Sequence, residues 1–89
     1  MKAVHLVLKH QYYDAIDNGE KTVEYRDNTD YWRKRILGKH RSGMMVATIA
    51  IFHRGYTNQT MSFLIDYLVV PKPHEVDQQI EIHLGKRMN

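Results

Sequence analysis

Two long β-forming runs, MMVATIAIFH (residues 44–53) and MSFLIDYLVV (61–70), constrain the fold of this chain most strongly. Both runs are rich in apolar, β-branched and aromatic residues, and the polar stretch RGYTNQ that joins them is typical of a turn. Three shorter runs have a similar character: AVHLVLK (3–9), TVEYR (22–26) and IEIHLG (80–85). The sequence therefore predicts a sheet of about five mostly antiparallel strands.

Two short helices are expected between the early strands. The segment HQYYDAIDNG places Tyr and Ile side chains at helical spacing and ends at Asn18 and Gly19, a pair that commonly stops a helix in the left-handed region. The segment NTDYWRKRIL has Thr29 or Asp30 as the expected N-cap. This second helix is predicted to be amphipathic, with a strongly basic outer face.

A chain of 89 residues is predicted to form a single domain, residues 1–89, with one core. A domain of this size buries only about 60–65% of its unfolded surface and cannot divide that core in two. Five strands and two short helices make the expected fold class α+β, mainly β. A small, curved, mostly antiparallel sheet is expected to close as a barrel, because closure removes exposed strand edges.

Composition limits the kinds of functional site that this chain can form. The chain contains no cysteine, which excludes disulfides, thiolate metal sites and a cysteine nucleophile. None of the histidines is paired at a metal-ligand spacing such as HxxxH, so we predict neither a metal nor a cofactor. The apolar run near the N-terminus is short and is broken by His5, unlike a signal peptide or a membrane span. We therefore expect a cytoplasmic protein that is not associated with a membrane.

The positive charge is concentrated in the middle of the chain. The formal net charge is only +3, yet no acidic residue lies between Tyr31 and Ile65. That stretch carries six cationic side chains: Arg33, Lys34, Arg35, Lys39, Arg41 and Arg54. Concentrated positive charge favours a polyphosphate partner such as RNA, and the alternative is a solvated face that only aids solubility.

The stretch GEKTVEYRD brings opposite charges together at the start of an expected strand. Because side chains alternate along a strand, Glu24 and Arg26 should share one face, while Val23 and Tyr25 should enter the core. Lys21, in the preceding turn, can reach the same surface as Glu24. Two cations beside a carboxylate would keep it ionised and would aim donors and an acceptor at one spot. The alternative is a surface ion pair worth less than about 1 kcal/mol.

Gly19, Lys21, Glu24 and Arg26 reproduce the GxKxxExR signature of the ASCH (activating signal cointegrator homology) domain, which this chain resembles over most of its length. The ASCH domain is a small β-barrel similar to the PUA RNA-binding fold. The resemblance implies a PUA-like barrel with a cleft, lined by the signature residues, that binds RNA or a modified nucleoside. A role in RNA metabolism or in translation-linked regulation would follow.

In this interpretation Glu24 accepts hydrogen bonds from a base edge, and Lys21 and Arg26 hold phosphate or carbonyl oxygens. Stackable rings lie beside cations in Tyr31-Trp32 and in the turn that follows Arg54, the combination that single-stranded nucleic-acid sites use. Trp32 is either a core residue or such a platform. The remaining predicted ligand-binding residues form an outer rim: Lys9, Arg33, Lys39, Arg41, Arg54 and Tyr56.

The alternative function is a small hydrolase that uses the same cleft. Some small bacterial members of the ASCH family act as ribonucleases or as N4-acetylcytidine amidohydrolases, and in such an enzyme Lys21 and Glu24 would be the catalytic residues. The amidohydrolase members carry a Thr, thought to be the nucleophile, where this chain has Glu24, and this difference argues against that activity. His53 is the best-placed histidine for a general base. A third, weaker hypothesis is a module whose basic middle docks an acidic protein.

Overall fold

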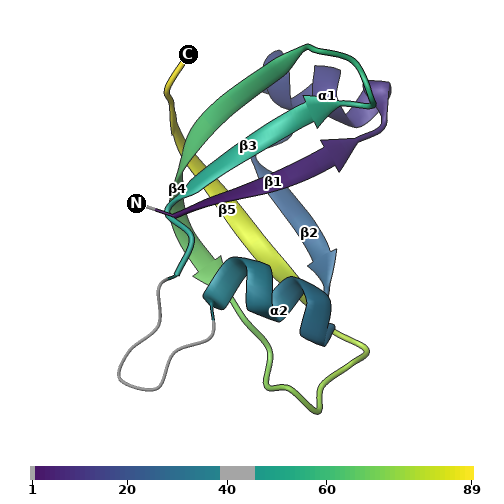
Figure 1. The fold of residues 1–89 in the computed structure, drawn as a ribbon, viewed down its shortest axis with the longest axis vertical. Helices are drawn as coiled ribbons and strands as arrows, with labels where there is room; N and C mark the ends of the chain where they lie inside the picture. Colours follow the sequence, from purple (N-terminus) through teal and green to yellow (C-terminus); the bar gives the residue numbers. More distant parts are fainter. Residues whose placement is uncertain (1, 39–45) are drawn as a thin grey trace.

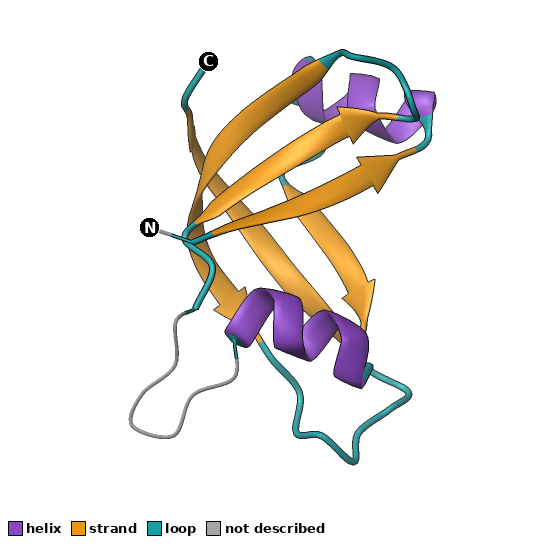
Figure 2. Ribbon diagram, viewed as in Figure 1, coloured by secondary structure: helices purple, strands orange, loops and turns teal. Residues whose placement is uncertain are grey.

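The computed structural model describes residues 2–38 and 46–89 and has the predicted α+β, mainly β, class (Figures 1 and 2). Strands and helices follow the expected order along the chain. They are β1 (Ala3–Leu8), α1 (His10–Asp17), β2 (Val23–Asp27), α2 (Asp30–Leu37), β3 (Ile49–Arg54), β4 (Thr60–Val69) and β5 (Gln79–Arg87).

The five strands form one strongly curled sheet with the order β1-β3-β4-β5-β2. Only the β1–β3 pair is parallel, and the other three pairs are antiparallel. Figure 1 shows α1 at one end of the sheet and α2 at the other end. The expected closed barrel is incomplete, because β1 and β2 are the two edges of the sheet and do not pair with each other. The sheet is therefore a half-barrel with an open side between these two edges.

The local signals that begin and end the elements act as predicted. Helix α1 ends at Asp17 with Asn18 as its C-cap, and Gly19 follows with a φ of 85°, in the left-handed region that glycine adopts without strain. The Thr29 hydroxyl accepts a hydrogen bond from the backbone N–H of Trp32 and so caps α2. Strand β3 begins at Ile49, later than expected, and residues 44–45 of the expected strand lie outside the described residues.

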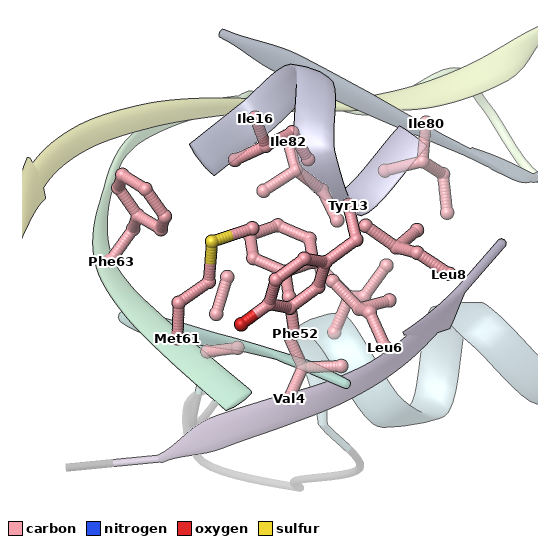
Figure 3. Packing of buried hydrophobic residues seen from close by; sticks show 13 residues of the cluster. Val4, Leu6, Leu8, Tyr13, Ile16, Phe52, Met61, Phe63, Ile80 and Ile82 are labelled. Atoms are coloured by element: carbon pink, nitrogen blue, oxygen red, sulfur yellow. The ribbon is translucent and has the colours of Figure 1, made fainter. Parts of the chain in front are cut away.

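The hydrophobic core fills the concave side of the sheet (Figure 3). Alternate residues of the strands point inward, as in β1, where Val4, Leu6 and Leu8 are all buried. Helix α1 adds Tyr13 and Ile16 from one end. The other buried hydrophobic residues are Ile36, Ala47, Ala50, Phe52, Met61, Phe63, Ile80 and Ile82. Each large side chain among them stabilises the fold by about 1.5–3 kcal/mol.

Strand β2 faces the core in the opposite sense to the prediction. Tyr25 was expected in the core but is 43% exposed, whereas Glu24 is only 3% exposed. The register explains the difference: Glu24 lies beside Ile82 of β5, which points into the core, and Tyr25 lies beside Glu81, which does not. Glu24 and Arg26 therefore share the inward face with Ile82 and Ile80 of β5, and the burial of Tyr25 was a wrong prediction.

Candidate functional site

Glu24 is the centre of a compact ion cluster that also contains Lys21 and Arg26. Its Oε1 accepts hydrogen bonds from Lys21 Nζ at 2.8 Å and from the backbone N–H of Tyr25 at 3.1 Å. Its Oε2 lies 3.2 Å from an Arg26 guanidinium nitrogen. The Lys21 and Arg26 side chains remain 26% and 19% exposed. Two partly exposed cations thus lie beside one buried carboxylate, and their attraction offsets the desolvation cost of burying its charge.

Arg26 connects the ion cluster to the open side of the half-barrel. One guanidinium nitrogen donates to the Val7 carbonyl at 3.3 Å, so Arg26 bridges from edge strand β2 to edge strand β1. The guanidinium carbon also lies 5.0 Å from the centroid of the Trp32 ring on α2. Its Nε is buried and has no hydrogen-bond partner among the described residues. Arg26 is therefore held by Glu24 and by the Tyr25 and Val7 carbonyls, and only its terminal guanidinium nitrogens can reach a ligand.

A cleft of about 490 Å³ opens beside Arg26, between β1, β2 and α2. Its volume lies within the range of about 300–1,000 Å³ that is usual for small-ligand sites. Aromatic rings and polar groups line it together: His5, Val7, Tyr25, Arg26, Asp27, Tyr31, Trp32 and Gln79. Trp32 packs partly against the core and also lines this cleft, so it is not a core residue alone.

Of the three signature side chains, the structure brings only Arg26 to the wall of this cleft. Glu24 is buried behind Arg26, and both of its carboxylate oxygens are occupied. Lys21 lies on the far side of Glu24, with its Nζ 5.0 Å from the centroid of the Tyr12 ring. Glu24 is thus placed to orient Arg26, Lys21 pairs with Glu24, and neither lines the cleft.

Helix α2 does not present all its cations in the same way. Arg33 donates at 2.8 Å both to Asn28 Oδ1 and to the Pro71 carbonyl, and so holds the connector that follows β4. Lys34 and Arg35 are exposed. The structure therefore gives Arg33 a structural role, although the sequence predicted it as a phosphate contact.

Other predicted rim residues lie at the α1 end of the sheet, away from the walls of the cleft. Lys9 is the N-cap residue of α1, and Tyr56, in the turn after β3, is 99% exposed. Arg54 forms a bidentate ion pair with Asp14 of α1, at 3.0 and 3.1 Å. The hydrogen bond from Arg54 lowers the pKa of the Asp14 carboxyl. Lys39 and Arg41 lie outside the described residues.

His5, Tyr25, Asp27, Tyr31 and Gln79 line the cleft but were not among the predicted site residues. Only the Tyr31-Trp32 pair gave a signal in the sequence, as rings beside cations. The others come from three separate strands, β1, β2 and β5, and are brought together by the curl of the sheet. Because these residues are far apart in the sequence, their spacing does not predict that they line one cleft.

His5 has one further contact at the edge of the cleft. Its Nδ1 lies 2.8 Å from Nε2 of His53 on the neighbouring strand β3, and the two rings are 5.1 Å apart. One imidazole must donate and the other accept, so this hydrogen bond fixes the orientation of both rings. His53 was the histidine that the sequence favoured as a base, but His5 lines the cleft and His53 contacts it only through His5.

A scan against protein-family models finds no family that matches this chain. A search of curated proteins finds no matching relative either. Within residues 2–38 and 46–89, neither helix is long and apolar enough to cross a membrane. In the same part of the chain, no three His, Asp or Glu side chains are grouped so that they could hold a metal ion.

Proposed function

We propose that this chain is an ASCH-type domain that binds RNA or a modified nucleoside in the cleft between β1, β2 and α2. One observation carries the proposal: Arg26 of the GxKxxExR match reaches from the buried Glu24 to an aromatic cleft of about 490 Å³. The curled, mainly β sheet with two short helices is also consistent with a PUA-like barrel.

The walls of the cleft supply what a nucleobase needs. Tyr25, Tyr31 and Trp32 bring three rings to the cleft, and a planar base can stack on the ring surface that the guanidinium groups over Trp32 and Tyr31 leave uncovered. Asp27 and Gln79 share one hydrogen bond at 3.3 Å, and the Asp27 Oδ2 and Gln79 Oε1 oxygens remain as acceptors for the polar edge of that base. This mixture of rings and a few polar groups favours a base over a purely aliphatic ligand.

Arg26 is the group we assign to a carbonyl or phosphate oxygen of the ligand. Its hydrogen bonds to the Tyr25 and Val7 carbonyls measure 3.4 and 3.3 Å, and its ion-pair contact with Glu24 measures 3.2 Å, all longer than the roughly 2.7–2.9 Å of strong charge-assisted bonds. A guanidinium held by long bonds has donor capacity left for a stronger acceptor. Glu24 then acts as the positioning residue for Arg26, in place of the direct base contact that the sequence suggested.

A second candidate, an RNA hydrolase in the same cleft, is favoured by the His5–His53 pair. Cleavage needs a general base for the 2′-hydroxyl, and a neutral imidazole oriented by a hydrogen bond can serve in that role. His5 lines the cleft, whereas the oxygens of Glu24 are already occupied. In a hydrolase of this kind His5 is the base and Arg26 stabilises the developing negative charge.

The test compares Tyr31→Ala with Tyr67→Ala, because both tyrosines are 53% exposed and only Tyr31 lines the cleft. Binding of a fluorescent mixed-sequence RNA hexamer is titrated for each variant. One stacked base is worth about 1–3 kcal/mol, so Tyr31→Ala should weaken binding by about 5- to 150-fold, and Tyr67→Ala by less than about twofold. Equal losses in the two variants, or no binding by the unaltered chain, would contradict the proposal.

The same samples are incubated with the RNA hexamer and with N4-acetylcytidine, and products are separated by chromatography. Binding without product supports the binder. If the unaltered chain forms product, and the rate of product formation falls by a factor of about 10²–10⁴ in His5→Asn while binding is retained, the hydrolase is established instead.

A further inference from the structure

A ladder of cations and rings runs along the α2 side of the cleft. Arg26 lies over the Trp32 ring at 5.0 Å, and Trp32 meets Tyr31 edge to face, with 5.0 Å between the ring centroids. The Arg35 guanidinium in turn lies 3.5 Å from the centroid of the Tyr31 ring. The order Arg26, Trp32, Tyr31, Arg35 therefore extends from the ion cluster, past the cleft, to the last turn of α2.

A second hollow of about 370 Å³, the basic groove, lies at the far end of this ladder. It is lined by Lys2, Ala3, Val4, His5, Lys34 and Arg35, and its described lining residues include no carboxylate. His5 also lines the cleft, so the two hollows adjoin. Three cations and no acid at the wall of a small groove favour an anionic group.

The cations of the basic groove are held without being neutralised. Lys2 Nζ donates to the Lys34 carbonyl at 3.1 Å, which covers a carbonyl of the last turn of α2 that would otherwise repel an anion. Within the described part of the chain, neither Lys34 nor Arg35 forms an ion pair with a carboxylate. A guanidinium stacked on a ring keeps its N–H donors pointing outward in its own plane, where they suit a phosphate.

We infer that the basic groove binds the phosphate next to the base in the cleft, so that the ligand is a nucleotide unit of a single RNA strand and not a free nucleoside. The inference rests on the proposed function and adds its substrate class. His5 lines both hollows, so a base in the cleft lies next to the basic groove, and the phosphate attached to that base can reach Lys34 and Arg35. A free nucleoside would bring no anionic group to Lys2, Lys34 and Arg35.

The experiment measures the affinity of the full chain for cytidine, cytidine 3′- and 5′-monophosphates, and a mixed-sequence RNA hexamer. The variants are Lys34→Ala/Arg35→Ala and the control Lys72→Ala/Lys86→Ala, which removes the same charge from exposed positions outside the basic groove. Circular dichroism establishes that each variant is folded. Each titration is repeated over a series of salt concentrations.

We expect a monophosphate to bind at least about tenfold more tightly than cytidine, and the hexamer more tightly still. The basic-groove variant should lose the preference for phosphate, and its slope of log affinity against log salt for the hexamer should fall by about 1.4, or about 0.7 for each lost phosphate contact. The control variant should retain most of the slope and the full preference for phosphate.

Several results would overturn the inference. If cytidine binds as tightly as its monophosphates, the phosphate assignment is wrong although the proposed function stands. If a monophosphate matches the hexamer, the ligand is not a strand. If the control variant loses the phosphate preference as fully as the basic-groove variant does, the effect is general charge and not this groove. If no probe binds, both the inference and the proposed function fail.

Discussion

Removal of the Glu24 carboxylate should destabilise the fold far more than removal of an exposed acid. Glu24→Ala deletes hydrogen bonds from Lys21 and from the backbone N–H of Tyr25, together with the ion pair to Arg26. Breaking a buried ion pair by removing one partner typically costs about 3–5 kcal/mol. Here both cations are partly exposed and can recover some hydration, so we expect a loss of about 2–3 kcal/mol in the free energy of unfolding.

The substitution Glu24→Gln separates the contribution of the negative charge from that of the size of the side chain. Glu24→Gln keeps the size of the side chain, and its amide oxygen can still accept from Lys21, but its NH₂ group then faces the donors of Arg26. We expect a loss of about 1–2 kcal/mol, between that of Glu24→Ala and that of the control Glu20→Gln, which alters an exposed carboxylate. The free energy of unfolding should therefore be highest for Glu20→Gln, intermediate for Glu24→Gln and lowest for Glu24→Ala.

Urea unfolding followed by circular dichroism measures these differences as shifts of the midpoint at constant slope. For a domain of this size each kcal/mol also lowers the melting temperature by about 4–8 °C, so Glu24→Ala should melt about 10–20 °C lower. A double-mutant cycle with Arg26→Ala should give a coupling energy of at least about 1 kcal/mol. If Glu24→Ala costs no more than about 0.5 kcal/mol, or if the two changes are additive, the ion cluster does not stabilise the fold.

Two further predictions concern side chains outside the cleft. Arg33→Ala should destabilise the fold by about 2–3 kcal/mol in urea unfolding, because it removes hydrogen bonds to Asn28 and Pro71; a loss of less than about 0.5 kcal/mol would refute that structural role. Because the hydrogen bond from Arg54 lowers the pKa of Asp14, this pair stabilises the fold above the ordinary pKa of about 3.8, and the contribution is lost as pH falls through the lower folded value. Asp14→Asn should therefore flatten the fall in the urea midpoint between about pH 5 and pH 2, and an unchanged pH profile would contradict this reasoning.

The secondary structure was largely predictable because each element carries its own local pattern. The turn between the long strands, the stop at Gly19 and the cap at Thr29 depend on neighbouring residues only, so the sequence predicts them without the tertiary fold. The later start of β3, at Ile49, is a boundary error of the kind expected where an apolar run extends beyond its strand. Local chemistry thus predicts where elements lie better than how far they extend.

The facing of β2 could not be predicted from the same kind of pattern. In the segment VEYR, apolar and charged side chains alternate, and placing Val23 and Tyr25 inward has the lower free energy for an isolated strand. The opposite facing becomes acceptable only when Lys21 and Arg26 are close enough in space to compensate Glu24. The sequence pattern already places these cations near Glu24, but the register that sets Glu24 beside the inward-facing Ile82 of β5 exists only in the folded chain.

The inward charges of β2 also explain why the cleft lies where it does. An edge strand that directs a carboxylate and a guanidinium inward is a poor partner for further strand pairing, so the sheet stays open between β2 and β1. Arg26 spans part of that opening by its hydrogen bond to the Val7 carbonyl, and the Trp32 ring of α2 lies beside its guanidinium. The interruption that prevents a closed barrel therefore creates a hollow with one oriented cation in its wall. A closed barrel with Tyr25 packed inside would have a better-covered core but no such cleft, so the same two charges account for both the incomplete sheet and the candidate binding site.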